Sequence, residues 1–174
     1  DLEDLKLLAQ KVNGGIKYEG KYFKQTANIN LNNTEWTPIG TVTNDGKDAR
    51  PFKGTFDGDG YKITKLKVTG NSYNAGLFGN VLGATIQNCN VTGEIEGNNF
   101  VGGIVGSTGK NTKILNCSFQ GDVKGNECVG GIAGWGVGKI KNCYALADVT
   151  AASAGAGGIA GKAYGVTIEN CYYS

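Results

Sequence analysis

The side chains best suited to catalysis in this sequence are five cysteines, because the chain contains no histidine. Without histidine there is no His-dependent zinc hydrolysis, no Ser-His-Asp or Cys-His catalysis and no histidine proton shuttle. A nucleophilic cysteine also needs a base or a positive charge beside it. Four cysteines instead share one repeat position, at Cys89, Cys117, Cys143 and Cys171, whereas Cys128 falls outside it. We therefore predict a buried ladder of free thiols, and neither a catalytic cysteine nor a set of disulfides.

The carboxylates offer two further candidate sites. Asp57-Gly58-Asp59-Gly60 has the beginning of a calcium-binding loop, but the twelfth position of such a loop requires Glu and is Val68 here, so a turn between strands is favoured. Glu94 and Glu96 are acidic residues of the type that hydrolyses glycosides. They flank Ile95 on one predicted strand and should face water. We expect no catalytic residue, no cofactor and no metal.

Aromatic residues give a candidate contact surface in place of a catalytic centre. Tyr144 and Tyr172 each follow a repeat cysteine, so they should point outward, and their separation of 28 residues places them on adjacent repeats. Trp135 and Tyr164 are expected to be exposed nearby. These four rings could stack against the sugar rings of a carbohydrate or contact another partner. The alternative interpretation is a favourable aromatic pair on one face of a sheet.

A repeat with two markers positions these residues. The first marker begins at Gly76, Gly103, Gly131 and Gly158, reads Gly-Leu-Phe-Gly, Gly-Ile-Val-Gly and twice Gly-Ile-Ala-Gly, and recurs in steps of 27, 28 and 27 residues. The second is an Asn-Cys pair at 88–89, 116–117, 142–143 and 170–171, in steps of 28, 26 and 28 residues. Repeats of this period without a 3.6-residue pattern exclude the helical repeat proteins.

Each repeat is predicted to contain three short strands, which makes an all-β parallel β-helix, or solenoid, of about 27 residues per coil. The first strand is the glycine marker, the second runs through Asn-Cys to Val91 in the first copy, and the third contains Ile95. Asn88 should make the turn, because asparagine tolerates the left-handed backbone region. Equivalent side chains then stack, and the amides of Asn88, Asn116, Asn142 and Asn170 should form a ladder.

The N-terminal part is predicted to be a cap over residues 1–50, continuous with β-helical repeats over 51–174. A helix is expected over 1–13, because Leu2, Leu5, Leu8, Ala9 and Val12 fall on one helical face. Irregular strands should follow it. A repeat array leaves its terminal core exposed, and such a helix can cover it.

The repeat is predicted to start in degenerate form after residue 51. Residues 63–70 align with 86–93 through their apolar positions and a closing Val-Thr-Gly. Residues 54–56 likewise align with 76–78. In this alignment Lys65 stands where later copies carry the asparagine.

Composition excludes several classes of protein. The 174 residues are the size of one domain, and the 17 basic and 15 acidic residues nearly balance. Arg50 is the single arginine, which argues against a nucleic-acid groove. No apolar run approaches the ~18 residues that span a membrane. The absence of Met and of a signal-like start leads us to expect a mature fragment or an excised domain of a longer chain.

The glycine marker followed by Asn-Cys resembles the GLUG repeat of bacterial surface proteins. The resemblance covers residues 76–174 and extends over 51–75 through the segment Pro51–Gly60. It implies a large secreted or wall-anchored bacterial protein, adhesin-like or associated with an immunoglobulin A-cleaving zinc peptidase. No catalytic residue belongs to the repeat motif, so none is transferred to this chain.

The resulting functional expectation is a non-catalytic, extracellular segment at a bacterial cell surface, acting as an adhesive surface or a spacer. Its expected partners are a host glycan or protein and the rest of a longer chain, with no nucleic acid. The alternatives are a polysaccharide-processing β-helix enzyme and an accessory domain of a larger surface peptidase. Short corners and the near-absence of arginine make the enzyme less favoured.

Overall fold

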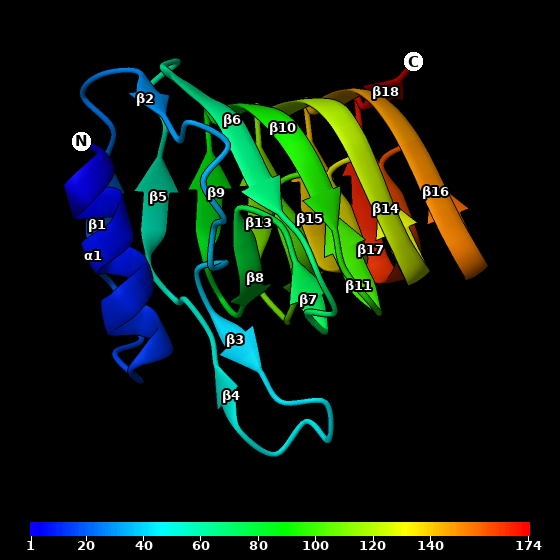
Figure 1. Ribbon diagram of the computed structural model, residues 1–174, viewed down its shortest axis with the longest axis horizontal. Helices are drawn as coiled ribbons and strands as arrows, with labels where there is room; N and C mark the ends of the chain where they lie inside the picture. The colour runs from blue at the N-terminus through cyan, green and yellow to red at the C-terminus, as the bar shows by residue number, and fades with distance from the viewer.

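The computed structural model describes residues 1–174, which form one helix followed by eighteen strands (Figure 1). The elements are α1 (Leu2–Asn13), β1 (Tyr22–Lys24), β2 (Ile29–Asn30), β3 (Thr41–Val42), β4 (Ala49–Arg50), β5 (Thr55–Asp57), β6 (Lys62–Val68), β7 (Asn74–Ala75), β8 (Phe78–Val81), β9 (Thr85–Gln87), β10 (Asn90–Glu96), β11 (Phe100–Gly102), β12 (Val105–Thr108), β13 (Lys113–Leu115), β14 (Ser118–Gly130), β15 (Ala133–Lys141), β16 (Tyr144–Gly157), β17 (Ala160–Glu169) and β18 (Tyr172–Tyr173). The chain is therefore all-β after its first element.

Two eight-stranded parallel sheets form the solenoid (Figure 1). Sheet A has the order β1-β5-β9-β13-β15-β12-β8, with β17 paired to β15. Sheet B has the order β18-β16-β14-β10-β6-β2, with β11 joined to β14 and β7. The sheets make about four turns with a coil of about 28 residues, which confirms the predicted parallel β-helix. A separate antiparallel pair, β3 and β4, extends from the first coils.

Helix α1 lies across the N-terminal end of the stack (Figure 1), and its bounds confirm the helix predicted over 1–13. Leu5, Leu8, Ala9 and Val12 are its buried face. Asp1 begins the helix as one partner of a capping box, which satisfies backbone donors of the first turn. No helix of the protein has the length and apolar character that a membrane span requires.

Each coil turns at the two sequence markers. After Gly76 the chain runs through β8 and β9 in sheet A, turns at Asn88 and returns through β10 and β11 in sheet B. Asn88, Asn116, Asn142 and Asn170 all have a left-handed φ between 48° and 54°. The asparagine turn is thus confirmed in all four copies.

One strand boundary within the coil was predicted wrongly. Val91 and Ile95 lie on the same strand, β10, and not on two strands separated by a corner. Val91, Gly93 and Ile95 keep the strict alternation of inward positions, because the chain stays extended through Gly93. Leu66 of the preceding coil pairs with Gly93, and its bulk fills the space that the glycine leaves.

The degenerate copy has a different register from the predicted one. Phe56 pairs with Ile86 and not with Phe78, and Ile63 pairs with Val91 and not with Ile86, so both predicted alignments were wrong. Several strands of one coil share the same apolar alternation, and a local match can therefore select the wrong strand. Lys65 has a left-handed φ of 56° because it lies where the β6–β10 register shifts.

Parallel pairing begins before residue 51. β1 pairs with β5 and β2 pairs with β6, with Ile29 opposite Ile63. Ile39 also bridges to Phe78. Residues predicted to be irregular thus already supply strands to both sheets, although they carry neither sequence marker.

Columns of inward side chains fill the solenoid. The column Ile86, Ile114 and Ile140 is at most 1% exposed, whereas its last member, Ile168, is 42% exposed at the end of the stack. The column Leu77, Ile104 and Ile132 is fully buried. Burial of these columns is shared between neighbouring coils, so no coil has a complete core alone.

The first glycine of each marker is required by packing. A Cβ at Gly131 would lie 2.5 Å from Ala145 Cβ and would also collide with the carbonyl oxygen of Gly158 in the next coil. A Cβ at Gly103 would collide with the ring of Phe119. The marker therefore recurs because coils approach too closely at this corner for any other residue.

Candidate binding surface

Four aromatic side chains on successive coils form a continuous row, which we call the aromatic stripe: Tyr73, Phe100, Trp135 and Tyr164. The ring centroids of Tyr73 and Phe100 are 5.2 Å apart, those of Phe100 and Trp135 5.3 Å apart and those of Trp135 and Tyr164 6.5 Å apart. The first two contacts are edge-to-face, a favourable geometry for aromatic rings. The stripe follows the corner at which the chain passes from sheet B to sheet A.

The fold of the coil does not require an aromatic residue at the position of Trp135. Trp135 pairs in register with Ser107 of the preceding coil and Lys162 of the next, and Ser107 pairs with Asn80. The equivalent positions in other coils are thus polar. Tyr164 at the end of the stripe is 70% exposed, so its ring is available for a contact with a partner. Trp135 is only half-buried and not exposed as expected, because its ring packs between Phe100 and Tyr164.

The structure divides the four predicted contact residues between two sheets. Trp135 and Tyr164 belong to the stripe on sheet A, whereas Tyr144 and Tyr172 lie in register on β16 and β18 of sheet B. The rings of Tyr144 and Tyr172 are stacked, with centroids 5.1 Å apart and an interplanar angle of 4°. Their contact with a carbohydrate or another partner stays a prediction.

Sequence reasoning missed Tyr73 and Phe100 because they are not repeat-equivalent to Trp135. Phe100 pairs with Asn74 on the strand that precedes the glycine corner, while Trp135 follows that corner one coil later. The available signal was proximity to a glycine marker, since every stripe residue lies within four residues of one.

A lysine ammonium completes the stripe. Lys162 Nζ lies 5.0 Å from the centroid of the Trp135 ring, a cation–π distance. Lys162 forms no ion pair with a carboxylate. The stripe therefore combines apolar ring surface with a positive charge at its centre.

The repeat cysteines lie in the core and are free. Cys89, Cys117 and Cys143 are buried, and Cys171 is half-buried in the last coil. Each Sγ–H donates to the carbonyl oxygen two residues earlier, at 3.2 to 3.3 Å. Burial raises the pKa of Cys117, Cys128 and Cys171, and hydrogen bonding to Cys117 together with burial raises the pKa of Cys143. Raised values keep these thiols protonated and poorly nucleophilic.

The corner asparagines form one directional chain of hydrogen bonds. Asn116 Nδ2 donates to Asn88 Oδ1 at 3.2 Å, Asn142 to Asn116 at 3.1 Å and Asn170 to Asn142 at 3.3 Å. Asn88 Nδ2 donates to Asp57 Oδ1 at 2.9 Å, so a carboxylate ends the chain at its N-terminal side. The last three asparagines are exposed, which makes this an external ladder.

Asp57 accepts more hydrogen bonds than any other carboxylate of the protein. It accepts from Asn88 Nδ2 and Gln87 Nε2, both at 2.9 Å, from the backbone N–H of Asp59 at 2.8 Å and from the hydroxyl of Tyr22. Burial alone would raise the pKa of Asp57, but these hydrogen bonds together lower it well below its usual range.

Asp57-Gly58-Asp59-Gly60 forms a turn whose carboxylates are already used. The Asp57 oxygens accept the four hydrogen bonds described above, and Asp59 pairs with Lys24 at 3.0 Å. No group of three or more His, Cys, Asp or Glu side chains is arranged to hold a metal ion. Glu94 and Glu96 are exposed on β10, facing water as their alternation predicts.

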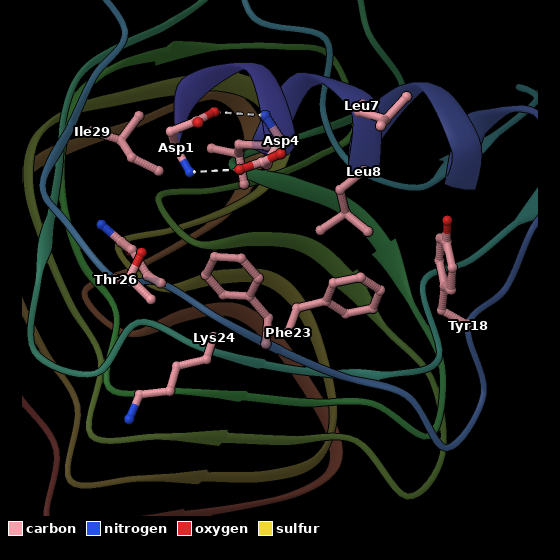
Figure 2. Close-up of a pocket in the computed structure, with 12 residues that line it drawn as sticks. Asp1, Asp4, Leu7, Leu8, Tyr18, Phe23, Lys24, Thr26 and Ile29 are labelled. Atoms are coloured by element: carbon pink, nitrogen blue, oxygen red, sulfur yellow. Dashed lines mark hydrogen bonds and ion pairs between the residues drawn. The ribbon is translucent and has the colours of Figure 1, made fainter.

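A cavity of about 480 Å³ lies between α1 and the first strands (Figure 2). Leu8, Phe23 and Ile29 give it an apolar lining, and Asp1 and Asp4 stand at its edge (Figure 2). Its volume is within the range of small-molecule sites. Its two acidic groups are held in the capping box of α1, so they are less available to orient a ligand. The aromatic stripe is therefore the stronger candidate surface.

Comparison with known proteins gives one match. Residues 125–150 match a family described as the GLUG motif. This segment runs from the end of one sheet B strand through the glycine corner of Gly131 to Asn142 and Cys143 and into β16. It contains both sequence markers of one coil. No curated protein and no solved structure matches the chain.

Proposed function

We propose that this chain, whose residues 125–150 match the GLUG motif, is a non-catalytic adhesive segment of a secreted or surface-anchored bacterial protein. Its adhesive contact is a glycan held on the aromatic stripe. A sugar ring has an apolar face of C–H groups, and this face packs against an aromatic ring in the way that other apolar surfaces do. The exposed ring of Tyr164 and the half-buried ring of Trp135 are the parts of the stripe that would hold such a face.

The observation that carries this proposal is the position of the stripe on a rigid repeat. Strand spacing separates successive coils by about 4.8 Å, and the four rings follow one another across successive coils in continuous contact. The aromatic side chain of Trp135 is not explained by the core, because the equivalent positions of the two preceding coils are Ser107 and Asn80. A row of rings along the solenoid axis suits an extended polymer better than a compact ligand.

The same architecture supports a spacer role alongside adhesion. Each coil adds about 4.8 Å to the length of the stack, and its core is shared with both neighbours. A stack of this kind carries its outer surface at a fixed distance from its first coil. The adhesive stripe and the spacer are therefore two properties of one structure.

The test is adhesion of beads coated with the protein to a panel of immobilised neutral and acidic oligosaccharides. Trp135→Ala should abolish retention on the glycans that wild type binds. Tyr61→Ala is the matched control, because it removes an exposed aromatic ring that belongs neither to the stripe nor to the stacked pair on sheet B. Retention of the Trp135→Ala beads at wild-type levels, or no retention of wild-type beads on any glycan, would contradict the proposal.

A further inference from the structure

The outer face of sheet A carries an excess of positive charge next to the aromatic stripe. Lysine side chains project from β13, β15 and β17 at Lys113, Lys139, Lys141 and Lys162, whereas the single acidic side chain of these strands is Glu169. Glu169 contacts Lys139 at 3.8 Å and Lys141 at 3.5 Å. The four lysines therefore exceed the one carboxylate by three positive charges.

The opposite face carries charges of both signs. Its acidic residues on β10, β14 and β16 include Glu94, Glu96, Asp122 and Asp148, whereas its lysines are Lys124 on β14 and Lys62, Lys65 and Lys67 on β6, with Lys67 directly opposite Glu94. The positive excess is therefore found on sheet A, although the formal net charge of the protein is only +2. An anionic polymer would be attracted to sheet A more than to sheet B.

The lysines of sheet A stand in an arrangement that does not favour folding. Lys113 and Lys139 are directly paired in register on β13 and β15. Like charges directly opposite each other on neighbouring strands are destabilising, and Lys113 forms no ion pair in the structure. An anion bound between Lys113 and Lys139 would relieve this repulsion, so this row of lysines is suited to bind negatively charged groups.

Lys162 connects the charged face to the stripe. Its ammonium group lies over the Trp135 ring and it pairs in register with Trp135. Glu127, on the other side of the corner, has the opposite charge and the opposite effect on the Cys128 thiol, whose pKa Lys162 lowers and Glu127 raises. The corner alone is thus close to neutral, and the positive excess comes from the lysine row.

We propose that the aromatic stripe and the adjoining lysine row of sheet A bind an acidic polysaccharide, with sugar rings on the stripe and their carboxylate groups at Lys162, Lys139 and Lys113. This inference rests on the proposed function and specifies its ligand class. The polymer lies along the solenoid axis, so one chain contacts several coils at once. Carboxylate and sulfate groups share this chemistry, and the experiment separates them.

A single-stranded nucleic acid is the other polymer that combines rings with negative charge. Proteins that bind single-stranded nucleic acid present a groove of basic side chains along the phosphate backbone and stack the bases on aromatic rings. Here the chain has one arginine, Arg50, which lies on β4 at the N-terminal end. The structure therefore favours a glycan.

The experiment is isothermal titration calorimetry, in which the intact protein is titrated with each of four probes. A galacturonate hexamer supplies a carboxylate on each ring, cellohexaose supplies neutral rings, sulfated dextran supplies sulfate, and oligo(dT) supplies phosphate. The variants are Trp135→Ala and Lys162→Gln. The matched controls are Tyr61→Ala and Lys124→Gln, which remove an aromatic ring and a lysine charge away from the stripe and the lysine row. Circular dichroism melting should verify that each variant is folded.

We expect the galacturonate hexamer to bind more tightly than cellohexaose, and this difference to shrink as salt is raised. Trp135→Ala should weaken both glycans by about tenfold, the scale of ring stacking. Lys162→Gln should weaken the acidic hexamer by up to about fivefold, the scale of an exposed ion pair, and leave cellohexaose unchanged. Both control variants should bind like wild type.

Each remaining outcome counts against a different claim. Equal affinity for the neutral and acidic hexamers, still dependent on Trp135, overturns the acidic-ligand inference and leaves the proposed function standing. Preference for sulfated dextran over galacturonate reassigns the anion to sulfate and overturns the carboxylate assignment. Equal binding of oligo(dT), or binding that Lys124→Gln weakens as much as Lys162→Gln does, means nonspecific attraction of polyanions and overturns the inference. No glycan binding at all removes both proposals.

Discussion

In the coils that contain residues 16–58, the core and corners are held by contacts that each occur once, whereas from Gly76 onward similar contacts recur in every coil. The early core is aromatic: the Phe52 ring packs against Phe23 and Phe78, with centroids 6.1 Å and 5.4 Å away. The later core consists of columns of isoleucine and cysteine. Both regions belong to the same two sheets, so the solenoid cross-section does not require one particular set of side chains.

The difference also appears in the polar contacts. Asn13 at the end of α1 donates to Pro38 O at 3.0 Å and accepts from the Gly40 N–H at 2.8 Å, and Trp36 Nε1 donates to Leu77 O at 3.0 Å. None of these contacts has a repeat equivalent. The later coils instead reuse the asparagine ladder and the glycine corner. A given substitution should therefore have similar effects in the interior copies of the repeat, a smaller effect in the last copy, and position-specific effects in the cap.

The largest expected effect tests the glycine corner of the repeats. Gly131→Ala should lower the free energy of unfolding by about 3 kcal/mol, because the added methyl group collides with Ala145 and with the next coil. Gly103→Ala should cost a similar amount. Gly136→Ala is the control, since the nearest atom to its added Cβ would be 3.5 Å away. Urea denaturation measures all three, and a harmless Gly131→Ala would refute the packing explanation of the marker.

The next largest effect concerns Asp57, a carboxylate that has no equivalent in the later coils. Asp57→Asn should reduce stability at pH 7 by about 2 kcal/mol, because four donors lose a charged acceptor. The pKa of Asp57 is lower in the folded state than the usual value of about 3.9 in the unfolded chain. Its contribution is therefore complete above about pH 4 and is lost as pH falls toward the folded pKa.

Urea denaturation at pH 7 and at pH 3 tests this linkage. The difference in stability between wild type and Asp57→Asn should narrow at pH 3. Glu3→Gln, a change at an exposed acid of α1 that pairs only with Lys6, serves as the control. An Asp57→Asn difference that stays constant across this pH range would show that charge is not what Asp57 contributes.

A smaller effect separates the interior of the ladder from its end. Asn142→Ala removes two ladder hydrogen bonds and Asn170→Ala removes one, and both place alanine at a left-handed φ. Because the ladder is exposed, each bond should contribute only about 0.5 to 1 kcal/mol. Asn142→Ala should therefore cost more than Asn170→Ala by about that amount.

Glycine variants isolate the hydrogen bonds from the turn. Asn142→Gly keeps the left-handed conformation accessible, so its cost relative to wild type reports mainly the lost amide. Denaturant midpoints for the four alanine and glycine variants at positions 142 and 170 provide the comparison. Identical shifts at both positions would mean that the ladder adds nothing beyond the turn.

The smallest expected effect concerns the stacked tyrosines. A double-mutant cycle of Tyr144→Leu and Tyr172→Leu should give a coupling of about 0.5 kcal/mol, since the rings are stacked but Tyr144 is only half-buried and Tyr172 is exposed. Tyr144→Leu combined with Tyr61→Leu is the uncoupled control, because Tyr61 lies between β5 and β6 in the first coils. A coupling near zero for the stacked pair would mean that its geometry has no energetic role.

The repeats were predictable from sequence because each of their constraints leaves a recurrent residue. The glycine corner, the asparagine turn and the inward isoleucines each come from backbone or packing demands that every coil repeats. The N-terminal coils fill the same space with Phe23, Phe52 and Phe56, and no marker fixes their register, which is why Ile63 was aligned with the wrong strand. Two residues of the stripe, Trp135 and Tyr164, were predicted. Phe100 was missed because it meets Trp135 across a corner and is not equivalent to it in sequence.

The two corners hold each coil in register while the segments between them vary in length. The interval from the last glycine of the marker to the asparagine is 9, 10, 8 and 9 residues in the four copies (79 to 88, 106 to 116, 134 to 142 and 161 to 170). The pairing of β15 with β17 absorbs such a difference by a register shift between Gly136 and Gly138. The hydrogen-bond chain of asparagines nevertheless continues unbroken. A coil of this solenoid can therefore gain or lose a residue between its corners and remain interchangeable with its neighbours, which allows such a protein to evolve in length by duplication of single coils.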